Sequence, residues 1–311
     1  MHKTRFSILI AAGVSLIGAA LAGEHAGHWT QGAPMPSERG EVAAAALDGK
    51  IYLIGGVDRQ LVDLEIYDPS NNQWSRGTKF PRGVHHTAMV ALNGKLYVVG
   101  GLVFDGSPTN AVYEYDPGTQ QWNEGTPMEI PRGALAAAVV DGKIHAVGGL
   151  SGLGRETPAH EVYDPAVKKW TAGAPLPTPR DGHVAAAVGQ QLYVIGGRTN
   201  GRSGNELGIN EAYDPANDRW EKRAAMPTAR SGSAAAAVAG RVFVVGGEAS
   251  SQSFNRVEAY DPKGERWHDY AAMPTARRGL AAVEVDGKLY VIAGGANPSK
   301  PASSANEIFE P

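Results

Sequence analysis

Arginine recurs at one position of this sequence, ten residues after a tryptophan. Its planar guanidinium group carries a fork of N–H donors that fits carboxylates and phosphates. A ring of such side chains would bind an anion, and the alternative is a structural salt bridge, between neighbouring units, to a glutamate that also recurs. The arginines at this position are Arg39, Arg132, Arg180, Arg230 and Arg277. The recurring glutamates, each two residues before an aromatic residue, are Glu65, Glu161, Glu211, Glu258 and Glu307.

Other polar residues depart from the small or apolar types that are usual within three residues of the arginine position. They are Glu41, His85, His86, Asp181, His183 and Arg278, and Arg82 and Arg198 are further arginines outside the repeated position. Carboxylates and imidazoles in one place are typical of acid and base catalysis. The adjacent pair His85-His86 belongs to a different repeat from His183, so we expect no metal ion and no cofactor.

A sixfold repeat must position these residues. Each unit has a tryptophan, the arginine position ten residues later, a glycine pair sixteen residues after that (Ala-Gly in the last copy), and then an aromatic residue before Asp-Pro or Glu-Pro. The six tryptophans are Trp29, Trp74, Trp122, Trp170, Trp220 and Trp267. Fixed-period repetition over this length indicates a repeat architecture.

Each unit predicts four strands, called a to d in chain order. Strand a is small and apolar, and a tight turn such as Asp48-Gly49 joins it to strand b, which ends at the glycine pair. Strand c ends at the aromatic residue and strand d carries the tryptophan. Alanine is a good helix former, but tertiary context overrides propensity. Six such units predict an all-β, six-bladed propeller with small side chains crowded near its axis.

The segment around Trp29 is predicted to close the ring of blades. Trp29 precedes the first strand a, whereas the last unit reaches Pro311 without a tryptophan. This segment would then be strand d of the last blade, and closure would remove exposed sheet edges.

The connections between strands divide between two faces. The a–b and c–d turns are short and share one face, and the d–a connections and variable b–c loops share the other. The longest b–c loops span residues 102–111, 150–160, 198–210 and 296–306. Binding residues lie mostly on loops held by a rigid scaffold, so we expect the site on the d–a/b–c face, where the arginine position also lies.

The double glycine, the tyrosine and the spaced tryptophan resemble the kelch repeat, over essentially the whole chain after residue 22. The resemblance implies the propeller fold, and some kelch domains bind acidic peptides through arginines. Copper radical oxidases share this architecture but need a tyrosine–cysteine crosslink, and this sequence has no cysteine.

Exported bacterial kelch proteins that mutarotate sialic acid suggest an alternative function, a carbohydrate isomerase or epimerase. Its acid and base would be Glu41 or Asp181 with His183. Arg180 or Arg278 would bind the substrate carboxylate.

The first 22 residues have the pattern of a secretory signal peptide. Lys3 and Arg5 precede an apolar run, and Ala20-Leu21-Ala22 fits the cleavage site. We therefore expect a signal peptide at 1–22, a propeller at 23–311, no membrane span after cleavage, and a periplasmic or secreted monomer. The net charge of −3 argues against nucleic-acid binding.

The leading hypothesis is a non-catalytic binding module for a protein or carbohydrate ligand, with the arginines favouring an anionic one. The candidate ligand-binding residues on the d–a/b–c face are Arg39, Glu41, Arg82, His85, His86, Arg132, Arg180, Asp181, His183, Arg230, Arg277 and Arg278.

Overall fold

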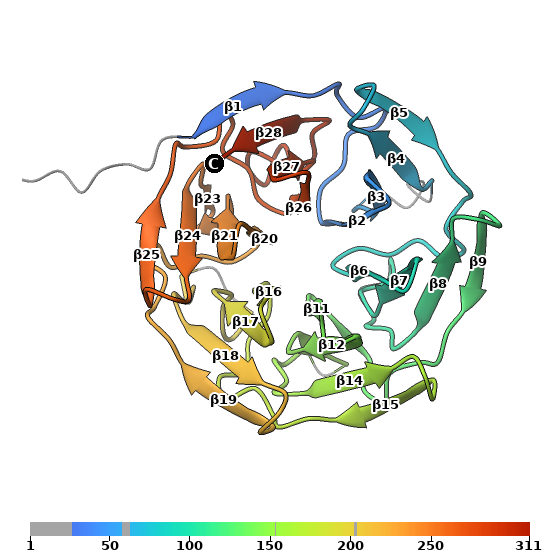
Figure 1. Ribbon diagram of the computed structural model, residues 1–311, viewed down its shortest axis with the longest axis vertical. Helices are drawn as coiled ribbons and strands as arrows, with labels where there is room; N and C mark the ends of the chain where they lie inside the picture. The colour runs from blue at the N-terminus through green and yellow to red at the C-terminus, as the bar shows by residue number, and fades with distance from the viewer. Residues whose placement is uncertain (1–26, 58–62, 153, 202–203) are drawn as a thin grey trace, which may run out of the picture.

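Six four-stranded antiparallel sheets stand radially around a central axis (Figure 1). The computed structural model describes residues 27–57, 63–152, 154–201 and 204–311. Within these ranges there is no helix, and so none that is long and apolar enough to cross a membrane. The predicted all-β, six-bladed propeller is confirmed, and the predicted signal peptide at 1–22 lies outside the described residues.

The blades follow one another along the chain, with their strands ordered from the axis outward. Blade 1 contains β2 (Val42–Leu47), β3 (Lys50–Gly55), β4 (Glu65–Asp68) and β5 (Gln73–Arg76). Blade 2 contains β6 (Ala88–Leu92), β7 (Lys95–Val99), β8 (Val112–Asp116) and β9 (Gln121–Glu124). Blade 3 contains β11 (Ala136–Val140), β12 (Lys143–Val147), β14 (His160–Asp164) and β15 (Lys169–Ala172).

Blades 4 to 6 repeat the arrangement. Blade 4 contains β16 (Val184–Val188), β17 (Gln191–Ile195), β18 (Asn210–Asp214) and β19 (Arg219–Lys222). Blade 5 contains β20 (Ala234–Val238), β21 (Arg241–Val245), β24 (Val257–Asp261) and β25 (Arg266–Asp269). Blade 6 contains β26 (Ala281–Val285), β27 (Lys288–Ile292), β28 (Asn306–Glu310) and β1 (His28–Gln31). Two short pairs lie in the loops: β10 (Arg132–Gly133) with β13 (Leu150–Ser151), and β22 (Glu248–Ala249) with β23 (Gln252–Ser253).

The first and last strands close the ring, as predicted. Strand β1 pairs antiparallel with β28, from His28 opposite Glu310 to Gln31 opposite Glu307. The Trp29 ring packs against Phe309 with a centroid distance of 4.8 Å. Figure 1 shows β1 outside β28, so the outermost strand of blade 6 comes from the opposite end of the chain.

The tryptophans join neighbouring blades at the outside of the ring. Each indole N–H donates to a carbonyl in the segment that leaves the preceding blade, at 2.8–3.2 Å. The acceptors are the carbonyls of Ala271, Ala33, Thr78, Thr126, Ala174 and Ala224. These six hydrogen bonds complete a circle, which explains why the tryptophan recurs in every unit.

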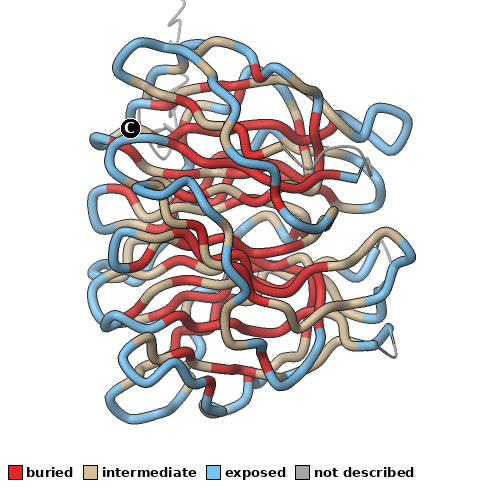
Figure 2. The backbone as a smooth tube through the Cα atoms, turned by 90° about the vertical axis from the view of Figure 1, so that its right-hand side faces the viewer, coloured by how far each residue is buried: buried red, intermediate tan, exposed pale blue. Residues whose placement is uncertain are grey.

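The innermost strands carry the alanines and surround the axis. Strands β2, β6, β11, β16, β20 and β26 contact one another in a closed circle. Figure 2 shows buried segments crossing the middle of the propeller and exposed turns on both faces. The a–b turns have the expected left-handed backbone, with φ of 50° at Asp48 and 72° at Gly49. These alanines form strands because pairing within the blade overrides their helix propensity.

A buried salt bridge lies inside five of the blades. The Arg180 guanidinium donates to Glu211 of β18 at 2.5 Å and to the Val194 carbonyl near the end of β17 at 2.9 Å. Burial lowers the pKa of Arg180, and the Glu211 carboxylate opposes that shift. The remaining pairs are Arg39–Glu65, Arg132–Glu161, Arg230–Glu258 and Arg277–Glu307. Each pair ties the d–a connection to strands b and c of the same blade.

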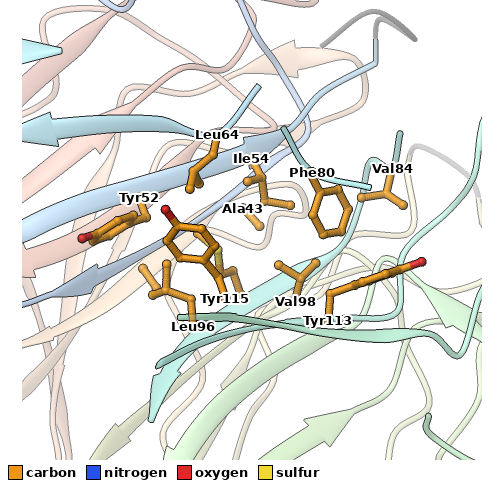
Figure 3. Close-up of a cluster of buried hydrophobic side chains, with 12 residues drawn as sticks. Ala43, Tyr52, Ile54, Leu64, Phe80, Val84, Leu96, Val98, Tyr113 and Tyr115 are labelled. Atoms are coloured by element: carbon orange, nitrogen blue, oxygen red, sulfur yellow. The ribbon is translucent and has the colours of Figure 1, made fainter. Parts of the chain in front are cut away.

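Blade 2 replaces this charged pair with apolar side chains. Val84 stands at the arginine position and Tyr113 at the glutamate position, and both are buried. Phe80 packs edge-on against Tyr113 with a centroid distance of 5.0 Å. Figure 3 shows the three side chains gathered between blades 1 and 2. Both members of the pair have changed together, so no buried charge is left unpaired.

The Arg180→Met change should lower the free energy of unfolding by about 3–5 kcal/mol, because it leaves the Glu211 carboxylate buried without a partner. The triple change Leu176→Phe, Arg180→Val and Glu211→Tyr copies blade 2 and should cost less than the single change. Urea denaturation measures both.

The control is Arg219→Ala, which breaks an exposed pair with Glu221 and should change stability by less than about 1 kcal/mol. Equal losses for the single and triple changes would contradict the role given to the buried charge.

Candidate functional site at the channel mouth

A closed ring of backbone hydrogen bonds surrounds the axis on the d–a/b–c face. One residue from each blade connection donates its N–H to the carbonyl of the corresponding residue in the preceding blade, at 2.7–3.3 Å. The six residues, here called the mouth ring, are Glu41, His86, Ala134, Gly182, Gly232 and Gly279. Because the bonds join all six blades in sequence, the mouth ring fixes their spacing around the channel.

All six members of the mouth ring have left-handed backbone. Three are glycines, with φ near 60°, and three are Glu41, His86 and Ala134, with φ of 59°, 51° and 52°. A non-glycine residue in this conformation costs about 1–2 kcal/mol. Strain of this kind gathers at functional sites. Glu41 and His86 therefore occupy positions where glycine would have less backbone strain.

Glu41 and His86 form a polar pair across adjacent blades. His86 Nε2 lies 3.2 Å from Glu41 Oε2, and His86 Nδ1 lies 2.6 Å from His85 Nδ1. Burial, together with the neighbouring His86, lowers the pKa of His85. The Glu41 carboxyl also lies over Gly279, where an added Cβ would come within 2.6 Å of it. Glycine at that position therefore makes room for the Glu41 side chain.

A second polar network lies beside the mouth ring at blades 4 to 6. Arg198 contacts Asp181 at 3.2 Å and Glu248 at 3.6 Å, and Arg278 contacts Glu248 at 2.6 Å. Asp181 is completely buried, and burial raises its pKa although Arg198 opposes the shift. Arg198 and Arg278 are therefore both paired with carboxylates.

The cavity at the mouth ring is small, about 100 Å³. Small-molecule sites usually span about 300–1,000 Å³. Its wall combines the polar Glu41 and His86 with Leu135 and Leu280. A cavity of this size has room for one side chain or a terminal group and not for a whole sugar.

Comparison with known proteins agrees with the propeller fold. The model of the KLHDC2/KLHL20/DRC7 Kelch-repeats domain matches residues 24–149 and 162–309, and the Kelch motif matches residues 131–177. The chain belongs to the Kelch-repeat family. The solved structure "Structure of YjhT" matches this Kelch propeller with a TM-score of 0.77 and 16% identity, over 88% of this chain and 95% of that one, which shows the fold alone. No curated protein matches the chain.

The prediction that the recurring arginines of this Kelch propeller form an anion-binding ring needs correction. These five arginines are buried to at least 99% and engaged by glutamates and carbonyls, so a ligand on the face does not reach them. They are Arg39, Arg132, Arg180, Arg230 and Arg277. The structural salt bridge is the interpretation that holds, within each blade and not between neighbouring units. Arg82 is exposed, and its charge acts on Asp105 of a b–c loop.

Only part of the set proposed for isomerase chemistry lines the mouth cavity. His183 is buried, its Nε2 lies 3.1 Å from the Val147 carbonyl, and burial lowers its pKa to about 3. Asp181 pairs with Arg198, and Arg180 is enclosed with Glu211. Of that set, Glu41 and His183 line the mouth cavity, and His86 joins them there.

Glu248 is a member of the site that sequence reasoning missed. A signal was present, because the position after the glycine pair holds Val57, Leu102, Leu150, Arg198, Glu248 and Gly295 in the six units. Two neighbouring units carry opposite charges there. Among the described residues, no three side chains of the metal-binding types are grouped for an ion.

Buried His183 should make the protein sensitive to acid. Its folded pKa lies below the ordinary value of 6.5, so its contribution to stability is full above pH 6.5 and falls as the pH drops. Between pH 6 and pH 4 the protein should lose about 1.4 kcal/mol more per pH unit than the His183→Leu variant.

Urea denaturation across that pH range provides the comparison. Leucine is the natural choice because Leu135 and Leu280 occupy the equivalent position. Other titrating groups contribute equally to both proteins and cancel. Parallel stability curves would mean that His183 is not held neutral by burial.

Proposed function

We propose that this Kelch propeller is an exported, non-catalytic binding module whose partner, a protein or a glycan, docks on the mouth ring and the loops around it. The fold itself is consistent with a binding module. The observation that carries the proposal is the pair Glu41–His86, which occupies strained positions of an otherwise regular ring. Export is proposed from the sequence pattern of residues 1–22.

A protein partner is favoured over a glycan by the shape and chemistry of the face. The cavity admits only a small group, so most of the contact would be made over the loops. Around the ring, the polar groups come from blades 1, 2 and 4 to 6, whereas Leu102 and Leu150, in the b–c loops of blades 2 and 3, are partly exposed apolar side chains. A mixed surface of this kind, with an apolar part and a polar part, is typical of interfaces between proteins.

The ligand need not be anionic. That expectation was based on arginines that are now seen to be enclosed. The charged groups that border the mouth are already paired, Glu41 with His86 and Glu248 with Arg198 and Arg278. A partner that exchanges hydrogen bonds with these pairs, through neutral or mixed polar groups, fits them better than a free anion.

The double change Glu41→Gly and His86→Gly should abolish partner capture while keeping the fold. Glycine relieves the left-handed strain at both positions, so the free energy of unfolding should fall by no more than about 1 kcal/mol. The measurement is affinity capture from the cell envelope of the source organism, with a glycan array as a second arm.

The mature protein recovered from the envelope should begin at Gly23.

Lys168→Ala with Lys169→Ala, at the c–d turn and the start of β15 on the opposite face, is the matched control. Loss of capture with the glycine variant and retention with the alanine variant is the expected pattern. The reverse pattern would place the binding surface on the other face. Equal capture by all three proteins would contradict a role for the mouth.

A further inference from the structure

A groove between blades 3 and 4 lies away from the mouth, on the a–b/c–d face. Its volume is about 390 Å³, within the usual range of small-molecule sites. Its wall includes His145 of β12, Ala172 of β15 and Tyr213 at the end of β18. We call it the His145 groove. None of its residues takes part in the mouth ring or the networks beside it.

The repeat shows that this groove is a modified scaffold feature. Between blades 1 and 2 the equivalent groove is lined by Tyr52, Arg76 and Tyr115 and measures about 270 Å³. The position of His145 carries Tyr52, Tyr97, Tyr193, Phe243 and Tyr290 in the other five units. The position of Ala172 carries Gln31, Arg76, Glu124, Lys222 and Asp269. Two smaller side chains therefore meet in one groove and enlarge it.

A third departure from the repeat orients the His145 ring. His160 stands where the other units have leucine, valine or asparagine, and it is 98% buried, as is His145. His160 Nδ1 lies 3.0 Å from the Ala174 carbonyl, and His160 Nε2 lies 3.0 Å from His145 Nδ1. Burial lowers the pKa of His145 to about 3 and that of His160 to about 4, so both rings are neutral at pH 7.

The hydrogen bonds fix where the protons are. A carbonyl oxygen only accepts, so His160 Nδ1 must carry a proton and donate to Ala174. His160 Nε2 is then the acceptor, and His145 Nδ1 must donate to it. His145 Nε2 is left as an unprotonated acceptor on a ring that lines the groove.

Two of the charged side chains of the groove wall, Asp218 and Lys143, have partners. Asp218 accepts from the Tyr213 hydroxyl at 2.6 Å and from the Ala174 N–H at 2.7 Å. Lys143 pairs with Asp164 at 3.0 Å. Asp141, in the a–b turn, is the other carboxylate of the wall. The Nε2 of His145 is thus an acceptor that this network leaves for a ligand, and the Asp141 carboxylate is another.

We propose that the His145 groove binds a small neutral molecule whose ring bears a hydroxyl group, with the hydroxyl donating to His145 Nε2. The aliphatic parts of Val140, Val162 and Pro215 pack against the ring of the ligand. The volume suits a single ring, either a phenol or a pyranose. This site is independent of partner binding at the mouth, so either proposal stands or falls without the other.

Titration of the full-length protein with phenol, anisole and methyl glucopyranoside tests the proposal, by calorimetry and by ¹⁵N NMR of the histidine rings. Anisole has no donor and should bind about threefold to tenfold more weakly than phenol, the difference made by one neutral hydrogen bond. The Nε2 resonance of His145 should move with phenol and stay in place with anisole. If phenol binds more tightly than the glucoside, the ligand ring is aromatic, and if the glucoside binds more tightly, it is a pyranose.

His145→Tyr introduces the tyrosine that four of the other five units have and should remove binding. Ala172→Arg should also remove binding, because the longer side chain fills the groove. Ala172 is exposed, so the change leaves the core undisturbed. Arg76→Ala, in the equivalent groove, should create no new site because Tyr52 remains. Absence of binding by any hydroxylated ring, or binding unchanged in both groove variants, would overturn the proposal.

Discussion

In five of the six blades, an arginine that precedes the innermost strand donates to a glutamate of the third strand and to a carbonyl near the end of the second. Each of these side chains is nearly inaccessible to solvent, so neither member is stable there without the other. The pair holds the d–a connection against its own blade. Blade 2 also leaves no buried charge unpaired, because Val84 and Tyr113 replace both charged residues with uncharged ones.

Two circles of hydrogen bonds then connect the blades. The indole N–H groups form the outer circle, and the backbone of the mouth ring forms the inner one. The arginine holds each d–a connection against its own blade, and the mouth ring holds it against the neighbouring blades. The connections therefore form a rigid support. Side chains on such a support keep their geometry without help from a ligand, which lowers the entropy cost of binding. Glu41 and His86 have this support.

The sequence was sufficient for the architecture because the repeat is strict. Six tryptophans in register predicted six blades, and the displaced Trp29 predicted that β1 would close the ring. The tight turn at Asp48-Gly49 followed from residues that tolerate positive φ. These features depend on local chemistry and on period, and both can be read from the chain alone.

The site was less accessible to sequence reasoning, since residue type does not give side-chain direction. Arg180 and Arg278 are both arginines at or beside the repeated position, yet Arg180 is enclosed and Arg278 reaches Glu248 of the preceding blade. The contact between His145 and His160 depends on the register of β12 against β14, which sets the two rings side by side. Comparing each position across the six units would have marked both histidines as departures from the repeat.

Amide hydrogen exchange at the six residues of the mouth ring tests the central claim most directly, because each N–H is assigned to a bond between two blades. All six amides should exchange as slowly as those of the inner strands, and Gly182 and Gly232 should lose this protection first when Arg180 is replaced. Rapid exchange at these positions in the unaltered protein, at the rate of the exposed turns, would contradict a rigid mouth held by the buried pairs.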